Sequence, residues 1–241
     1  MTDFVQLWVY LASTPLFGLT ATLLVYVLAQ AIYQGLGQAP WANPVLLSVV
    51  LLATGLHWSG TAYPSYFSGA QFIHFLLGPA VVALAWPLWL RLPALRRHWR
   101  HFLLAAFAGG AVAACSAVGL AWALDLPHAV LLSLAPKSVT APVAMGIAEK
   151  IGGVPALAAV FAVCTGMVGA LLGKYLFDAL GLGRDRRGWM ARGFALGTAA
   201  HGIGAARALQ VDADAGAWAA LALGLQVLLT SLLIPLVARW L

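Results

Sequence analysis

Long apolar segments joined by short polar connections dominate this chain and limit what it can fold into. Most of them approach or exceed the roughly 20 residues that a helix needs to cross the hydrocarbon core of a bilayer. The eight segments lie at 15–34, 44–58, 71–90, 102–124, 128–148, 154–177, 191–209 and 216–238. Only 8% of the residues are charged, whereas a soluble domain carries about a quarter. The sequence therefore predicts an all-α, polytopic membrane protein of about 7–8 membrane segments, organised as one domain over residues 1–241.

The basic residues gather in two connections, Arg91–His101 and Gly183–Arg192. Basic clusters beside apolar segments are typical of cytoplasmic loops and of contact with anionic lipid. We therefore expect the lipid bilayer, and no nucleic acid, as the partner of these residues. The connection Gln210–Gly216 instead holds two aspartates and no basic residue. We expect segment 191–209 to run outward to this acidic connection and 216–238 to return.

The positions of the two basic connections also constrain whether segment 128–148 crosses the membrane. If both basic connections are cytoplasmic, an even number of crossings must separate them, yet three apolar segments lie between. One segment should then enter and leave on the same side. Pro136 and Pro142 interrupt the helix ladder of 128–148 and favour a re-entrant turn there. The alternative is a kinked helix that crosses fully, with one basic connection on the other side.

The stretch "SLAPKSVTAPVAM", from Ser133 to Met145, carries the polar residues of that segment. A helix that restarts at Lys137 would point its N-terminal N–H groups toward the break, and these attract anions. Lys137 adds a positive charge, while Ser138 and Thr140 add hydroxyl donors. We expect Pro136, Lys137, Ser138 and Thr140 to bind a small carboxylate anion. The alternative is that Lys137 extends to the headgroups and the hydroxyls bond backbone carbonyls.

A second broken segment resembles the first. "LLGPAVVALAWPL" contains Gly78, Pro79 and Pro87, and its two prolines are placed much like those of "SLAPKSVTAPVAM". Paired discontinuous helices in internal, inverted repeats build the midplane sites of secondary transporters. We therefore expect Gly78 and Pro79 to contribute to the substrate site and the break within Gly78–Ala83 to face that at Pro136–Thr140. Chance similarity is the alternative, because the match is short.

The segment Gly193–Gln210 combines glycines with two ionisable residues. Intramembrane His and Arg are functional candidates because isolated charges there are costly. His201 and Arg207 lie on different faces of a regular helix, but a distortion at Gly202–Ile203–Gly204 would turn both toward one cavity. We include His201, Gly202, Gly204 and Arg207 among the substrate-binding candidates. The alternative is that the glycines are packing contacts and Arg207 reaches the acidic connection.

No zinc-ligand spacing, phosphate loop or nucleophile motif is present in the sequence. We therefore expect neither enzyme activity nor a catalytic residue, and no metal or other cofactor. Lys174 and Asp178 are spaced i,i+4 and are predicted to form a surface ion pair.

Three motifs, in order and spacing, resemble the LrgB/CidB family of bacterial membrane proteins. They are "LLGPAVVALAWPL", "SLAPKSVTAPVAMGIAEKIGGVPALAAVFAVCTGMVGALLG" and "ARGFALGTAAHGIGAARAL", and the resemblance runs from about Pro15 to the C-terminus. The chain departs from the family pattern at four positions where the family usually has hydroxyl side chains, which leaves the exact substrate open. These positions are Val81, Ala141, Ala200 and Ala205.

The resemblance implies two alternative functions. Bacterial members are described as holin-like or antiholin-like regulators of murein hydrolase export and autolysis that act with an LrgA/CidA-type membrane partner. A plant chloroplast relative, similar to this chain in its C-terminal half, exchanges glycolate and glycerate, and some bacterial pairs are described as handling pyruvate. Together with the lysine motif this favours a transporter of small carboxylates. We expect a homo-oligomer, such as a dimer, in the bacterial cytoplasmic (inner) membrane.

Overall fold

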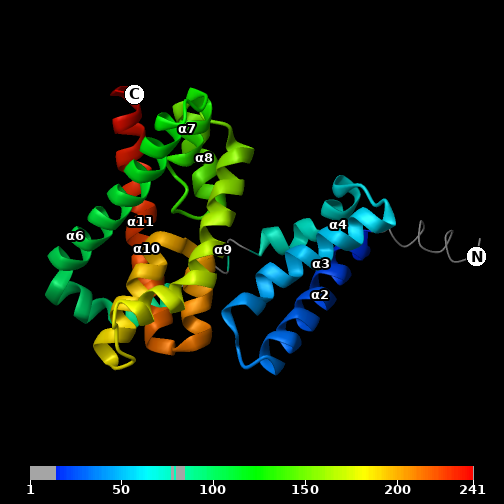
Figure 1. Ribbon diagram of the computed structural model, residues 1–241, viewed down its shortest axis with the longest axis horizontal. Helices are drawn as coiled ribbons and strands as arrows, with labels where there is room; N and C mark the ends of the chain where they lie inside the picture. Colours follow the sequence, from blue (N-terminus) through cyan, green and yellow to red (C-terminus); the bar gives the residue numbers. More distant parts are fainter. Residues whose placement is uncertain (1–14, 77–78, 80–84, 241) are drawn as a thin grey trace, which may run out of the picture. The chain divides into compact units, whose positions relative to one another are not determined.

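The computed structural model describes residues 15–76, 79 and 85–240. Within these ranges every regular element is a helix, which confirms the all-α prediction (Figure 1). The chain divides into two compact units, Met1–Ala83 and Leu84–Leu241.

The first unit is a small helical assembly. Its elements are α2 (Pro15–Gly35), η1 (Pro40–Ala42), α3 (Pro44–Ser59) and α4 (Tyr63–Phe75). α2 packs against both α3 and α4. Gly18 allows the close approach, because a β-carbon there would overlap the Tyr66 backbone. One turn further along α2, the Thr22 hydroxyl bonds the Tyr66 hydroxyl at 2.7 Å.

The second unit holds the remaining helices. They are α6 (Ala85–Ala123), α7 (His128–Leu134), α8 (Ala141–Ile151), α9 (Pro155–Ala179), α10 (Arg186–Val211), α11 (Ala213–Val237) and η2 (Ala238–Trp240). α7 and α8 lie at the end of the unit where α11 finishes, and the connection from α9 to α10 lies at the other end (Figure 1). The buried residues Phe102, Phe194 and Trp218 join α6, α10 and α11 in a hydrophobic core.

Four helices in the described ranges are long and apolar enough to cross a membrane: α2, residues Trp99–Ala123 of α6, α9 and α11. α3 is apolar but shorter. The predicted segment 128–148 is divided between α7 and α8. These findings fit a polytopic membrane protein, while the total of 7–8 segments stays a prediction.

The first basic connection is helical, so the prediction of a loop at Arg91–His101 is wrong. These residues belong to α6, which continues through Pro93. The leucines, alanines and arginines around this proline are strong helix formers and favour continuation. The basic segments nevertheless lie at the same end of the second unit, because His101 and Met190 line one cavity. Their common membrane side stays a prediction.

α10 folds back on itself. The two halves lie side by side, since a β-carbon on Gly204 of the second half would lie 2.6 Å from the Leu196 carbonyl oxygen of the first. Trp189 and Leu196 also pack against a cluster that contains Ala205 and Ala208. α11 then begins beside the first half, where Gly193 meets the Ala215 carbonyl. Segment 191–209 was predicted to run outward to the acidic connection. This prediction is wrong, because the C-terminal end of the segment lies at the level of Gly193, close to where the segment begins. Asp212 is the single residue between α10 and α11, so the predicted acidic connection is shorter than expected. Its carboxylate accepts a hydrogen bond from the Ala215 N–H at 3.0 Å and caps α11.

Candidate functional site

The predicted break in the opening stretch is present. α7 ends at Leu134, turns follow, and α8 begins at Ala141. The helix therefore restarts four residues later than predicted, and Lys137 lies in the turns rather than at a helix N-terminus. Pro142 explains the difference, because proline fits the first turn of a helix, where no intrahelical N–H donor is needed. Thr140, in extended conformation, is the residue before this turn.

The two ends of this broken element are tied together. The Ser133 hydroxyl accepts a hydrogen bond from the Val154 N–H at 2.8 Å and donates one to the Ala129 carbonyl at 2.6 Å. Val154 lies just beyond α8, so the chain has returned to α7. The turns between the helices thus form the tip of a hairpin-like element.

Lys137 and Ser138 lie in this tip and have unsatisfied polar atoms. Lys137 is half-buried, and no described residue forms a hydrogen bond or an ion pair with its ammonium group. Ser138 is 6% exposed, and its hydroxyl has no hydrogen-bond partner in the described structure. The Thr140 side chain makes no capping bond to α8. The tip thus offers one cation and two hydroxyls that the described protein leaves available.

A second irregularity lies in α10 at Ala200–His201, just before the predicted position at Gly202–Ile203–Gly204. Ala200 has φ −120° and ψ 15°, and His201 has φ 41° and ψ −133°. A positive φ at a non-glycine residue is strained and persists only where the surroundings hold it. His201 is buried, and its Nε2 lies 2.7 Å from the Ala162 carbonyl oxygen. Because a carbonyl only accepts, Nε2 carries the proton in this bond.

The fold brings the tip and the kink together. A β-carbon on Gly202 would lie 3.8 Å from the Thr140 methyl group. Val139, in the same turns as Lys137, packs in one cluster with Ala162 of α9, whose carbonyl bonds His201. Both features lie beside the interior of α9, since Ala162 is well inside this helix of 25 residues. Lys137, Thr140, His201 and Gly202 therefore form one cluster.

The other predicted residues have different surroundings. Pro136 is fully buried at the tip. Gly204 packs against the Leu196 backbone between the two halves of α10. Arg207 is buried in the second half of α10. Gly78 lies outside the described residues and Pro79 belongs to the first unit, so the facing of the two breaks stays a prediction.

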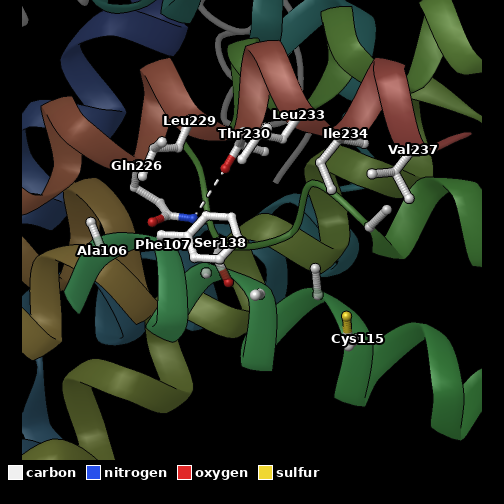
Figure 2. A pocket seen from close by; sticks show the side chains of 14 residues that line it. Ala106, Phe107, Cys115, Ser138, Gln226, Leu229, Thr230, Leu233, Ile234 and Val237 are labelled. Atoms are coloured by element: carbon white, nitrogen blue, oxygen red, sulfur yellow. Dashed lines mark hydrogen bonds between the residues drawn. The ribbon is translucent and has the colours of Figure 1, made fainter. Parts of the chain in front are cut away.

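Two polar residues of α11 belong near this site and were missed. Gln226 and Thr230 are 4% and 7% exposed, and the Gln226 Nε2 donates to the Thr230 hydroxyl at 3.1 Å. With Ser138 they line a cavity of about 380 Å³ whose remaining walls are apolar (Figure 2). Figure 2 shows both side chains projecting from α11, with the hydrogen bond between them dashed. Their i,i+4 spacing in an apolar segment was the signal available in the sequence.

A partly buried ion pair was also missed at the other end of the unit. The Arg192 guanidinium bonds Asp178 at 2.7 Å and also bonds the Leu182 and Gly183 carbonyls. The predicted pair of Lys174 with Asp178 is confirmed at 3.3 Å. Asp178 therefore anchors the start of α10 to the end of α9.

Comparison with known proteins assigns the chain to a family. The sequence model of the LrgB-like family matches residues 22–240. The chain belongs to the LrgB-like family. The uncharacterised protein YxaC of Bacillus subtilis is 35% identical over 84% of this chain and 86% of its own. No solved structure matches the chain.

The names of some LrgB-like relatives state a function for those proteins. The holin-like protein CidB of Staphylococcus epidermidis is 26% identical over 89% of this chain and 91% of its own. The antiholin-like protein LrgB of Bacillus cereus is 27% identical over 92% of this chain and 95% of its own. These names support the holin-like or antiholin-like alternative, and none of them states carboxylate transport. The similarity to the plant chloroplast protein stays a prediction.

Proposed function

We propose that this LrgB-like protein is a membrane transporter that binds small carboxylates, such as glycolate, glycerate, pyruvate or lactate, at the cluster of Lys137, Thr140, His201 and Gly202. The observation that carries the proposal is the half-buried Lys137 ammonium, for which the described residues provide neither an ion pair nor a hydrogen bond. A charge withdrawn from water is costly unless a counter-ion accompanies it. A carboxylate supplies that counter-ion and accepts hydrogen bonds.

The surroundings of Lys137 support an anion over a cation. The Thr140 hydroxyl makes no capping bond to α8 and can donate a hydrogen bond to an anion. The His201 ring lies nearby, and its Nε2 proton is donated to the Ala162 carbonyl. The carboxylates of Asp178 and Asp185 belong to the far end of the unit, with Arg192 and the start of α10. The site is proposed to lie near the membrane midplane, because His201 bonds the interior of α9.

A second function is favoured by the names of the relatives. A holin-like or antiholin-like protein would regulate murein hydrolase export and autolysis, together with an LrgA/CidA-type partner in the cytoplasmic membrane. Such a role requires assembly in the membrane and does not depend on an anion site. Carboxylate transport therefore requires Lys137, whereas a holin-like or antiholin-like role does not.

Counterflow in proteoliposomes tests the proposal. Vesicles that contain only this protein and unlabelled pyruvate or glycolate should accumulate the labelled acid. Lys137→Ala should reduce counterflow by about tenfold to a hundredfold, because a hydrogen bond to a charged group contributes about 1.5–3 kcal/mol. Lys137→Arg should restore little, since the planar guanidinium replaces a point charge. Lys150→Ala is the matched control, because Lys150 is exposed at the end of α8.

The outcomes separate the two functions. Counterflow that depends on Lys137 supports transport. If Lys137→Ala carries both acids at the rate of the unaltered protein, the carboxylate site is wrong. If neither acid moves, while Lys137→Ala still supports regulation of autolysis in cells, the holin-like alternative is the better description.

A further inference from the structure

The cavity of about 380 Å³ in the second unit lies between α6, α11 and the tip that joins α7 to α8 (Figure 2). Its volume falls within the range of small-molecule sites, roughly 300–1,000 Å³. Leu229, Leu233 and Ile234 line it from α11, and Ala111 and Ala114 line it from α6. None of the described residues that line the cavity carries a charge. A ligand that fits these walls is therefore neutral and mainly apolar.

Two buried polar atoms on the cavity wall lack a hydrogen-bond partner in the described structure. They are the Ser138 hydroxyl and the Gln226 Oε1, and the two residues are 6% and 4% exposed. The Gln226 amide nitrogen already donates to the Thr230 hydroxyl, so the oxygen is left as an acceptor. Buried polar atoms without partners are unfavourable and call for water or a polar ligand group. A hydroxyl group can serve either atom, because it accepts from Ser138 and donates to Oε1.

Gly110 of α6 holds the Gln226 amide in place. A β-carbon on Gly110 would overlap the amide nitrogen and lie 2.9 Å from Oε1. The amide therefore lies against the α6 backbone, and its bond to Thr230, one turn later on α11, fixes its orientation. From Gln226 to Val237, α11 rises about 16 Å, at 1.5 Å per residue. The other α11 residues along this wall are apolar, so the wall is polar at one end and apolar toward Val237.

The second unit, taken by itself, leaves this cavity open on the outer side of two helices. Phe107 and Val237 are 49% and 54% exposed, and Cys115 is also exposed. Figure 2 shows Cys115 and Val237 toward one side of the cavity and Gln226 toward the other. Both α11 and residues Trp99–Ala123 of α6 are long and apolar enough to cross a membrane. A membrane-dissolved ligand can therefore enter without passing through water.

We propose that this cavity binds a neutral, single-chain amphiphile from the membrane, with a hydroxyl group against Ser138 and Gln226 and an apolar chain along α11 toward Val237. A carboxylate is disfavoured here, because the described lining residues provide no cation to pair with it. The site is therefore distinct from the cluster around Lys137 and does not depend on carboxylate transport. Because Ser138 directly follows Lys137 in the tip, a bound amphiphile would hold the tip against α6 and α11.

Protection of Cys115 from a thiol reagent tests the site in the full-length protein, reconstituted in proteoliposomes. Cys115 lines the cavity, whereas Cys164, also exposed, lies on α9 outside it and is the internal control. The probe is dodecanol, whose extended chain is similar in length to residues 226–237 of α11, and the reagent is the neutral, membrane-permeant N-ethylmaleimide. At about ten times its Kd, dodecanol should slow labelling of Cys115 by about tenfold and change that of Cys164 by less than about twofold.

Matched molecules and variants test the polar and apolar parts of the site. Loss of one hydrogen bond should weaken dodecanol by about twofold to twelvefold, so Ser138→Ala and Gln226→Leu should each shift its midpoint by this factor. Dodecane, which has no hydroxyl group, should bind more weakly and be unaffected by Ser138→Ala. Ala114→Phe, in the cavity, should abolish protection by dodecanol. Ala108→Phe is the matched control, because Ala108 is exposed on the same helix and lies outside the cavity.

Four results would contradict the proposal. Equal protection by dodecane and dodecanol would exclude the hydrogen-bonded site, and stronger protection by dodecanoate would exclude a neutral ligand. Equal slowing of Cys115 and Cys164 would show that dodecanol acts only through the bilayer. Failure of Cys115 to react in the absence of dodecanol, while Cys164 reacts, would show that protein already covers the cavity. Each of these results leaves counterflow of carboxylates, and hence the proposed transport function, to be decided separately.

Discussion

Gly166 holds the position of the His201 ring, and Gly166→Ala tests this directly. A β-carbon at this position would lie 2.8 Å from Cε1 and 2.9 Å from Nε2 of His201, and 2.9 Å from the β-carbon of Ile203. Contacts this short require the ring to move, which breaks its bond to the Ala162 carbonyl. α9 and the kinked α10 would then separate at the point where the kink is held.

The magnitude follows from three contributions. Overpacking costs roughly 1–3 kcal/mol, and a lost hydrogen bond costs about 0.5–1.5 kcal/mol. Alanine has a better helix propensity than glycine, which stabilises the variant by about 1 kcal/mol. The net destabilisation is therefore roughly 0.5–3.5 kcal/mol, which corresponds to a fall of about 1–14 °C in Tm for a chain of this size.

Thermal unfolding of the purified protein in detergent measures this change. Gly146→Ala serves as the control, because a β-carbon there meets nothing within 4 Å in the interior of α8. Combination with His201→Ala should relieve part of the effect, since the contact with Ile203 remains. If Gly166→Ala is as stable as Gly146→Ala, the ring is not held against α9, and the account of the kink is wrong.

Two further predictions concern the arrangement of the second unit. Arg192→Ala should lower stability by roughly 1.5–3 kcal/mol, measured by thermal unfolding, because it removes the buried guanidinium that bonds Asp178 and the Leu182 and Gly183 carbonyls. Arg184→Ala should change little, since Arg184 is 62% exposed and 3.7 Å from the same carboxylate, and equal losses would contradict this difference. Because α10 folds back, Arg187→Cys and Ala213→Cys should be labelled from the same side of the membrane and Arg239→Cys from the other. Labelling of Ala213→Cys and Arg187→Cys from opposite sides would show that α10 crosses.

Local chemistry explains which features of the site the sequence predicted. Pro136 and Pro142 remove backbone donors, so a break between α7 and α8 is independent of the rest of the fold. The ion pair of Lys174 with Asp178 follows from helical spacing alone. The family also follows from the sequence, since its motifs extend along nearly the whole chain.

Helix boundaries in the polar stretches were less predictable. Pro93 suggested a loop, yet α6 continues through it because the flanking residues favour a helix and the rest of the segment supports it. The helix after the break begins at Ala141 rather than Lys137, since Pro142 fits only its first turn. Each of these outcomes depends on which of two local preferences is stronger.

Tertiary contacts alone decided how the broken elements meet. The composition of Gly193–Gln210 indicates a distortion, but only packing against α9 and α11 selects Ala200–His201 and folds the halves of α10 together. The pairing of Gln226 and Ser138 in one cavity joins residues 88 positions apart, which no local pattern encodes. The sequence by itself determined the apolar helices, the break and the family. The tertiary structure decided the cluster around Lys137, because side chains from α9, α10 and the α7–α8 tip converge only when the helices pack.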